Sequence, residues 1–142
     1  MNNAFFLLIL PSRTLTIHLG SYQQCTGLSL RGTCTSVSDV THLIHTVQQM
    51  LERRPAHAWI DGQQLLALSP LGQQAMLRAD ACGQQAGTQL HWCGLSPALQ
   101  HDLQASGLAE KLTIQPAASY EGPNFLLPER LAAPARQPQP LA

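Results

Sequence analysis

The sequence predicts an α/β domain in which about four to six strands form one mixed β-sheet, covered by about three or four helices. From Leu28 onward, short apolar runs typical of strands alternate with segments of helical periodicity, a pattern that indicates βαβ units and a partly parallel sheet. Two of the expected helices open with the same residue pair, at Ser69-Pro70 and Ser96-Pro97. The chain has 142 residues, 44% of them hydrophobic, which is enough for a single domain with a buried core.

An N-terminal β-hairpin is expected at the start of the chain. Phe5–Leu10 and Thr14–Leu19 have the composition of strands, and Pro11-Ser12-Arg13 between them has that of a turn. Apolar and polar residues alternate in the second run, so its apolar side chains should share one face. Residues 20–27 are polar and are expected to form a loop, which a short strand at 28–32 should follow.

The first helix is expected between Ser38 and Pro55. Its apolar residues form a continuous stripe at helical spacing, consisting of Val40, Leu43, Ile44, Val47, Met50 and Leu51. Ser38 or Asp39 is the expected N-cap, because a short polar side chain can accept hydrogen bonds from the free N–H groups of the first turn. Arg53-Arg54 suit the negative end of the helix dipole, and Pro55 should end the helix.

The stretch from Ala58 to Gln85 is the centre of the predicted architecture. An apolar strand ends at Asp61, a turn follows, and a second apolar run leads into a helix. Ser69 is a good N-cap, and Pro70 suits the first helical position, where its missing N–H costs nothing. The face expected to pack on the sheet consists of Leu71, Ala75, Ala79, Cys82 and Ala86. Gly87 should end this helix.

Three short elements are expected after this helix. Thr88–Cys93 has the composition of a strand. The helix that starts at Ser96-Pro97 should turn Leu99 and Leu103 inward. A last short strand is expected at residues 112–114.

The composition changes near the C-terminus, so the predicted domain covers residues 1–120. Residues 121–142 are rich in proline and alanine. They are predicted to form a flexible or loosely docked tail. Phe125-Leu126-Leu127 is the part of this tail that could anchor it in a groove.

The charge balance excludes several classes of partner. The formal net charge is zero and only 11% of residues are charged, against about 25% in typical domains. Nucleic acids and anionic membranes require clustered basic residues, so neither is expected as a partner. No apolar run reaches the roughly 18 residues of a membrane span. The four cysteines contain no C-x-x-C pair, which favours free thiols and a cytoplasmic protein.

No motif of an enzyme is present. The sequence has no G-x-S-x-G, no phosphate-binding glycine loop and no placed pair of carboxylates. His91 and Cys93 could form an imidazole–thiolate pair, but a cysteine on a central strand is more often an inert core residue. His42 and His45 lack further ligands nearby, so surface histidines are preferred to a metal site. We therefore expect no catalysis, no metal and no cofactor.

Several short motifs resemble those of the STAS family, the sulfate-transporter and anti-sigma-factor-antagonist domains. They are Trp59-Ile60-Asp61, Gly72 at the spacing of a family glycine, and the Leu103–Leu108 ending. The stretch from Gly83 to Trp92 is similar to the family's glycine turn and following strand. The resemblance covers roughly residues 28–115 and implies a single STAS-like domain of a bacterial signalling protein.

The chain departs from this family at the phosphorylated position. By register from Asp61 to Gly72, the family's phosphorylated Ser/Thr falls on Leu71, which has no hydroxyl group. The resemblance therefore implies that the phosphorylation switch is absent or has moved to Ser69. If it is absent, the Ser69 hydroxyl serves only as a helix cap.

The resemblance also implies a non-catalytic, regulatory protein–protein interaction module. The residues expected to bind the partner lie at two helix starts and are Ser36, Ser38, Asp39, Ser69, Pro70, Leu71, Gly72, Gln73 and Gln74. The expected partner is an anti-sigma factor or a kinase-like ATP-binding protein, and the zero net charge also permits a homodimer. The alternative is an accessory subunit of an ABC-type membrane transport assembly, where the same helix would bind an ATPase subunit.

Overall fold

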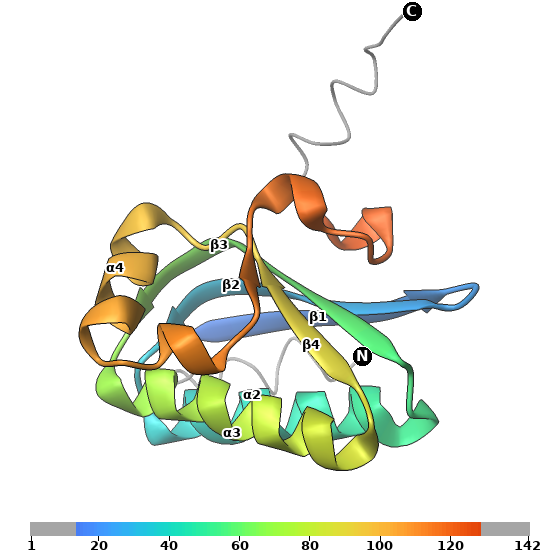
Figure 1. Ribbon diagram of the computed structural model, residues 1–142, viewed down its shortest axis with the longest axis horizontal. Helices are drawn as coiled ribbons and strands as arrows, with labels where there is room; N and C mark the ends of the chain where they lie inside the picture. The colour runs from blue at the N-terminus through green and yellow to red at the C-terminus, as the bar shows by residue number, and fades with distance from the viewer. Residues whose placement is uncertain (1–13, 129–142) are drawn as a thin grey trace, which may run out of the picture.

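A computed structural model describes residues 14–128 (Figure 1). Five strands form one sheet: β1 (Leu15–Tyr22), β2 (Cys25–Cys34), β3 (His57–Leu68), β4 (Gln89–Cys93) and β5 (Ile114–Gln115). The α-helices are α2 (Val37–Met50), α3 (Pro70–Ala86) and α4 (Pro97–Ala105). The strands lie in chain order, with β1 antiparallel to β2 and the other pairs parallel. The predicted α/β class and its mixed sheet are confirmed.

The hairpin is formed by β1 and β2, so its position differs from the prediction. Gly20 pairs with Gly27 and Tyr22 with Cys25, and Gln23 adopts a left-handed backbone with φ of 57° in the turn between them. The prediction of a loop at residues 20–27 is therefore wrong, because the two strands continue to pair through residues whose side chains are polar. The expected strand Phe5–Leu10 lies outside the described residues.

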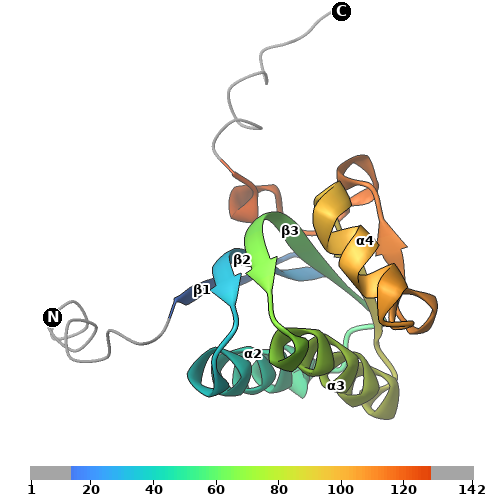
Figure 2. The same ribbon diagram turned by 90° about the vertical axis from the view of Figure 1, so that its left-hand side faces the viewer.

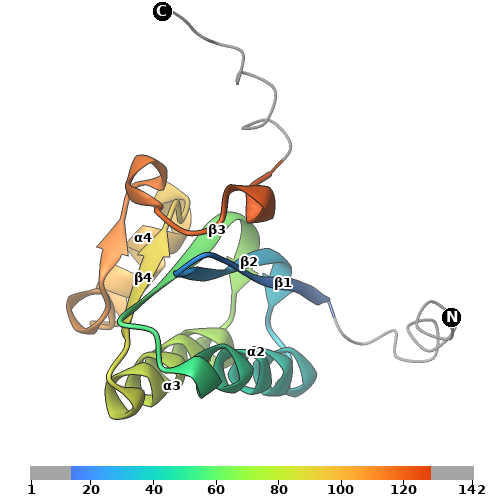
Figure 3. The same cartoon turned by 90° about the vertical axis from the view of Figure 1, so that its right-hand side faces the viewer.

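Helices α2 and α3 cover one face of the sheet, and α4 lies at the end of the sheet remote from β1 (Figures 2 and 3). The strand residues that face α2 and α3 are aliphatic, with Leu28, Leu30 and Ile60 almost fully buried. The predicted stripe of α2 joins the same core, with Leu43 and Val47 almost fully buried. Alternation along each strand leaves the other face to a different set of side chains.

Strand β3 runs continuously through the point where a turn was expected. Ser29 of β2 pairs with Asp61, but Arg31 pairs with Gln64, so β3 has one extra residue between these pairs. This is a β-bulge, which bends a strand without ending it. The polar residues after Asp61 resemble a turn in sequence, yet Asp61 is fully buried inside the strand.

The helix ends agree with the sequence for α3 and α4 but not for α2. Ser69 and Ser96 are the N-caps, and Gly87 ends α3 with φ of 80°. The N-cap of α2 is Ser36, two residues before Ser38 and three before Asp39, the two expected caps. Asp39 is the third residue of the helix and completes a capping box with Ser36.

The inward face of α3 is rotated relative to the prediction. Its buried residues are Gly72, Ala75, Met76, Ala79, Asp80 and Gly83. Ala75 and Ala79 were expected there, but Leu71 is 48% exposed, and Cys82 and Ala86 are half-buried. Gly72, rather than Leu71, faces the backbone of Cys34, which only a residue without a side chain can approach so closely.

The α4 prediction holds, whereas β5 is shifted. Leu99 and Leu103 are buried on the inward face of α4, as predicted. The last strand is Ile114–Gln115 instead of residues 112–114. Leu112 packs into the core just before it.

The Asp39 carboxylate ties together three segments near the start of α2. It accepts hydrogen bonds from the backbone N–H of Thr14, Leu15, Thr35 and Ser36, over 2.9–3.2 Å, and one from the Thr14 hydroxyl at 2.9 Å. Burial by itself would raise the pKa of Asp39, but these hydrogen bonds outweigh it and lower the pKa from 3.8 to about 2. The ionised carboxylate is therefore part of the folded structure.

Replacing Asp39 with asparagine should lower the free energy of unfolding by about 2 kcal/mol at neutral pH. The folded pKa is depressed, so this stabilisation is present above the ordinary pKa of 3.8 and is lost as the pH falls through about 2. Urea denaturation of Asp39→Asn and the wild type at pH 7 and near pH 2.5 would measure it. Asp102→Asn, at an exposed position of α4, is the matched control. The stabilising role of the Asp39 carboxylate would be contradicted by either of two results. One is a loss of unfolding free energy in Asp39→Asn no larger than that in Asp102→Asn. The other is a loss that stays the same at low pH.

Candidate functional site

The first turns of α2 and α3 lie side by side at the carboxyl ends of β2 and β3 (Figure 2). Parallel neighbouring strands end at the same edge of the sheet, so the helices that follow them start there as well. The Ser69 N–H donates to the Cys34 carbonyl over 3.2 Å. The Ser69 hydroxyl donates to the Thr35 carbonyl over 3.2 Å. Residues that are more than 30 positions apart in sequence are thus joined at one corner.

Gly72 permits this close approach. A Cβ atom at Gly72 would lie 2.2 Å from the Cys34 carbonyl oxygen, far inside contact distance. Any side chain here would push the first turn of α3 away from the end of β2. The glycine noted in the sequence therefore has a packing role in this corner.

The Ser69 hydroxyl is engaged as a helix cap. It accepts a hydrogen bond from the Gly72 N–H over 3.2 Å while donating to Thr35. This is the role expected from the sequence. Phosphorylation of Ser69 would replace both of these contacts. The choice between an absent switch and one moved to Ser69 is therefore left open by this geometry.

We define the helix-start surface as residues 35–38 together with Pro70, Leu71, Gln73 and Gln74. Two apolar side chains project from it, because Val37 is 69% exposed and Leu71 is 48% exposed. The other residues of this surface are polar or proline, and none carries a charge. The surface therefore combines two exposed apolar side chains with uncharged polar groups.

The structure brings the expected binding residues together but divides their roles. Asp39 is fully buried and Gly72 is also buried, so these two hold the surface in place without contributing area to it. Val37 was missed by the sequence analysis. Its signal was an apolar residue directly after a capping serine, where the first turn of a helix faces solvent.

The alternative catalytic pair does not form. The Cys93 thiol is fully buried and lies 3.8 Å from the backbone carbonyl of His91, instead of contacting the imidazole ring. Burial, with smaller contributions from Asp61 and Glu121, raises the pKa of Cys93 to about 11. A thiol held protonated in this way is a poor nucleophile.

His42 and His45 were expected to be surface histidines rather than metal ligands. His45 is exposed and His42 is half-buried on α2. Among residues 14–128, no group of three or more His, Cys, Asp or Glu side chains is placed to hold a metal ion. No helix in this part of the chain is long and apolar enough to cross a membrane.

The outer face of the sheet carries a polar network centred on Asp61. Ser29 donates to the Asp61 carboxylate over 3.2 Å and Gln63 donates over 2.8 Å. Arg31 donates from Nε to the Ser29 hydroxyl and from Nη2 to the Leu126 carbonyl. The buried carboxylate is therefore hydrogen-bonded and indirectly linked to a cation, as a buried charge requires.

The chain after β5 lies across this outer face (Figure 3). Pro123 and Leu126 are buried. The Tyr120 hydroxyl donates to the Pro123 carbonyl over 2.9 Å, and burial raises the Tyr120 pKa well above its usual range. A Cβ atom at Gly20 would lie 2.6 Å from the Phe125 ring. Residues 121–128 thus contact the sheet. The domain end predicted at residue 120 stays a prediction. Residues 129–142 of the predicted tail lie outside the described residues.

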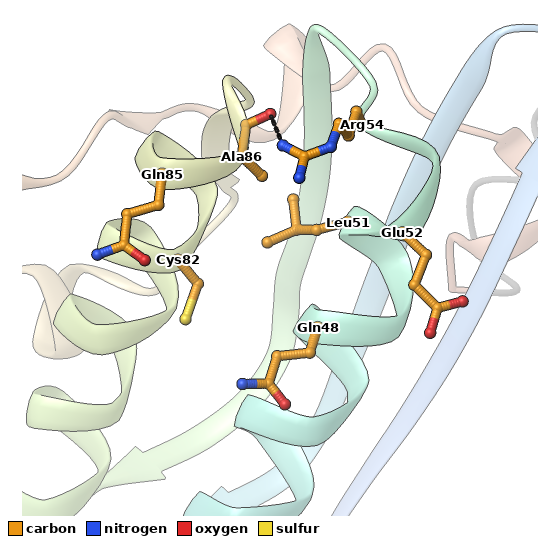
Figure 4. A pocket seen from close by; sticks show the side chains of 7 residues that line it. All are labelled: Gln48, Leu51, Glu52, Arg54, Cys82, Gln85 and Ala86. Carbon is orange, nitrogen blue, oxygen red and sulfur yellow. Dashed lines mark hydrogen bonds between the residues drawn. The ribbon is translucent and has the colours of Figure 1, made fainter.

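A shallow pocket of about 370 Å³ lies between the C-terminal ends of α2 and α3 (Figure 4). Arg54 reaches across it and donates to the Ala86 carbonyl over 3.4 Å. Leu51 and Cys82 are among the residues that line it. This pocket is at the other end of the helices from the helix-start surface, so it forms no part of that surface.

Comparison with solved structures identifies the fold. A sulfate transporter family protein from Wolinella succinogenes matches with a TM-score of 0.59 and 16% identity, over 68% of this chain and 80% of that one. An anti-sigma factor antagonist from Mycobacterium paratuberculosis matches with a TM-score of 0.59 and 14% identity, over 72% and 86%. The murine anion transporter Slc26a9 matches with a TM-score of 0.63 and 6% identity, over 80% of this chain but 22% of the transporter.

These similarities define the class of fold. The chain has a STAS-like fold, as the sequence motifs implied. No protein-family model matches the sequence, and no curated protein sequence matches it. Identities of 16% or less show the fold alone, and function has to be argued from the residues at the site.

Removal of the α3 cap should cost stability without rearranging the corner. Ser69→Ala should lower the free energy of unfolding by about 1 kcal/mol. Ser96→Ala removes the equivalent cap from α4 and should cost a similar amount, so it is the matched control. Thermal and urea unfolding of both variants would measure the losses. A loss several times larger for Ser69 than for Ser96 would show that its bond to Thr35 matters more than the cap.

Proposed function

We propose that this chain is a non-catalytic, regulatory protein–protein interaction module that binds its partner through the helix-start surface. The observation that carries this proposal is the exposure of Val37 and Leu71 on two helix starts held side by side. Large apolar side chains exposed together on a rigid support are typical of partner-binding sites. The buried Cys93 thiol, with its raised pKa, gives no support to an enzyme.

The preferred partner is an anti-sigma factor or a kinase-like ATP-binding protein. Support comes from the fold, which is shared with proteins described as anti-sigma factor antagonists. One of these is described as SpoIIAA in its unphosphorylated form. An antagonist acts by contacting another protein, and the helix-start surface is the apolar patch at the family's motif positions. The cytoplasmic location and bacterial source stay predictions.

Binding through this surface would be constitutive. Leu71 occupies the position of the family's phosphoacceptor, and its side chain has no hydroxyl group. Phosphorylation controls an interface by adding close to two negative charges, and Leu71 offers no atom for this modification. An apolar residue there instead adds contact area that a partner can bury.

The second candidate is an accessory subunit of a membrane transport assembly that binds an ATPase subunit. It is favoured by the fold match to a sulfate transporter family protein and to an anion transporter. The same surface would serve in both cases, and it could also bind a second copy of the chain. Co-purification that recovers transporter components would select this candidate over the first.

Leu71→Lys should weaken partner binding by about tenfold or more, because a charge would be buried in the apolar part of the interface. Val37→Lys should have a similar effect. Tyr22→Lys is the matched control, since Tyr22 is 61% exposed at the hairpin tip. Pull-down followed by titration with purified anti-sigma or kinase-like proteins from the same cell would measure this. The proposed role of the helix-start surface would be refuted if Leu71→Lys and Val37→Lys both bind the partner as the wild type does. It would also be refuted if Tyr22→Lys loses as much partner affinity as they do.

The absence of a switch can be tested separately. Mass spectrometry of the chain isolated from cells should recover the peptide that contains Ser69 and Leu71 without a phosphate group. Binding of Ser69→Ala to the partner should equal that of the wild type once its lower stability is allowed for. A phosphopeptide at Ser69 would show that the switch has moved by two residues.

A further inference from the structure

Strand β1 is an edge strand of the sheet. Among residues 14–128 it pairs only with β2, and it stands first in the order of strands. It has eight residues, whereas β5 at the opposite edge has two. Its sequence, LTIHLGSY, contains no proline and no Lys, Arg, Asp or Glu. These are the residues with which edge strands usually prevent the addition of another strand, so β1 is open to further pairing.

The hydrogen bonds at the start of β1 show which backbone groups point away from β2. The Thr33 N–H donates to the Thr14 carbonyl over 3.2 Å, so the carbonyl of residue 14 faces β2. Direction alternates from residue to residue along an antiparallel strand. Accordingly, the Leu15 N–H points away from β2 and donates to the Asp39 carboxylate over 3.1 Å. The next outward-pointing groups are those of Ile17, Leu19 and Ser21.

We call residues 17–21 of β1 the open edge. No group of residues 14–128 hydrogen-bonds to the outward N–H and C=O groups of this segment. Leu15 and Leu19 lie on the same face of the strand, yet their exposed fractions are 2% and 42%. A cavity of about 250 Å³ lies beside Leu19, and Met50 at the end of α2 also lines it. The apolar core is therefore incomplete next to the open edge.

We propose that the segment Phe5–Leu10 pairs with the open edge of β1 as an additional antiparallel strand. This segment lies outside the described residues and consists of six apolar residues, FFLLIL. A strand of six residues extends about 20 Å, and the open edge is about 14 Å long. The chain enters β1 from this segment through Pro11-Ser12-Arg13, so a hairpin connection is enough to bring it back along the edge. Pairing would begin at Ile17, because Asp39 occupies the edge at Leu15.

The covalent connection favours this segment over a second copy of the chain. A segment attached by a few residues acts at an effective concentration in the millimolar range, whereas a second copy is present only at the concentration of the protein. An added strand would also place apolar side chains beside Leu19 and the cavity, where they are removed from water. The zero net charge does not oppose association between copies. Covering the open edge would therefore keep β1 from pairing with β1 of another copy.

Amide hydrogen exchange, measured by NMR on the full chain, tests this pairing. The N–H groups of Ile17 and Leu19 should exchange about a hundredfold or more slowly than in an unstructured chain. NOEs should join backbone protons of residues 5–10 to those of the open edge. The double substitution Leu7→Pro/Leu8→Pro should abolish the protection of Ile17 and Leu19. Proline has no N–H, and one of two adjacent N–H groups faces β1 in any register.

Leu131→Pro/Ala132→Pro is the matched control, since it makes a double proline substitution in the C-terminal segment. Exchange at Ile17 and Leu19 should equal that of the wild type. The N–H groups of Thr16 and Gly20 point towards β2 and are the internal reference for an intact sheet. If Leu7→Pro/Leu8→Pro loses this reference protection as well, the wild-type NOEs decide the question, and their absence refutes the pairing.

Three results would overturn the proposal. In the first, Ile17 and Leu19 of the wild type exchange as fast as in an unstructured chain. In the second, their protection survives in Leu7→Pro/Leu8→Pro. In the third, their protection rises with protein concentration in step with dimer formation measured by analytical ultracentrifugation, which would assign the open edge to a second copy of the chain.

Discussion

The hydrogen bonds to the Asp39 carboxylate hold the start of β1, the loop after β2 and the first turn of α2 in one arrangement. A carboxylate removed from water must be fully hydrogen-bonded, since an uncompensated buried charge is very costly. The loop that it fixes contains Thr35, and the Thr35 carbonyl accepts from Ser69. The start of α3 is thereby placed next to the start of α2. The helix-start surface exists because these two turns are held together by backbone groups.

The two ends of the sheet carry different chemistry. At the carboxyl ends of β2 and β3, Val37 and Leu71 expose apolar area on an uncharged surface. At the start of β3 and along β4, the imidazole rings of His57 and His91 contact each other through ring nitrogens 2.9 Å apart. The buried network of Asp61 and its partners lies on the same outer face, beneath the chain that follows β5. The exposed apolar side chains and the paired imidazoles therefore belong to separate parts of the sheet.

Low sequence identity limits what the fold says about function. Structures that are 6–16% identical to this chain include an anion transporter and an anti-sigma factor antagonist, so one framework serves different systems. Function therefore has to be argued from the residues of this chain. Here Leu71 exposes an apolar side chain without a hydroxyl group, and Gly72 lies where the backbone of β2 comes close. Gly72 lets the first turn of α3 pack against the end of β2.

Local signals in the sequence determined the fold class, the stripe of α2 and the serine caps of α3 and α4, because each depends on residues within one or two turns. The sequence also located the corner at Ser69. Only the tertiary structure decided that β3 continues past Asp61, that Asp39 binds β1, and that His57 meets His91. These contacts join residues more than 20 positions apart, and their formation depends on strand pairing and bulges, which shift the register by single residues. Propensity and periodicity describe neighbours along the chain, whereas a site is formed by neighbours in space.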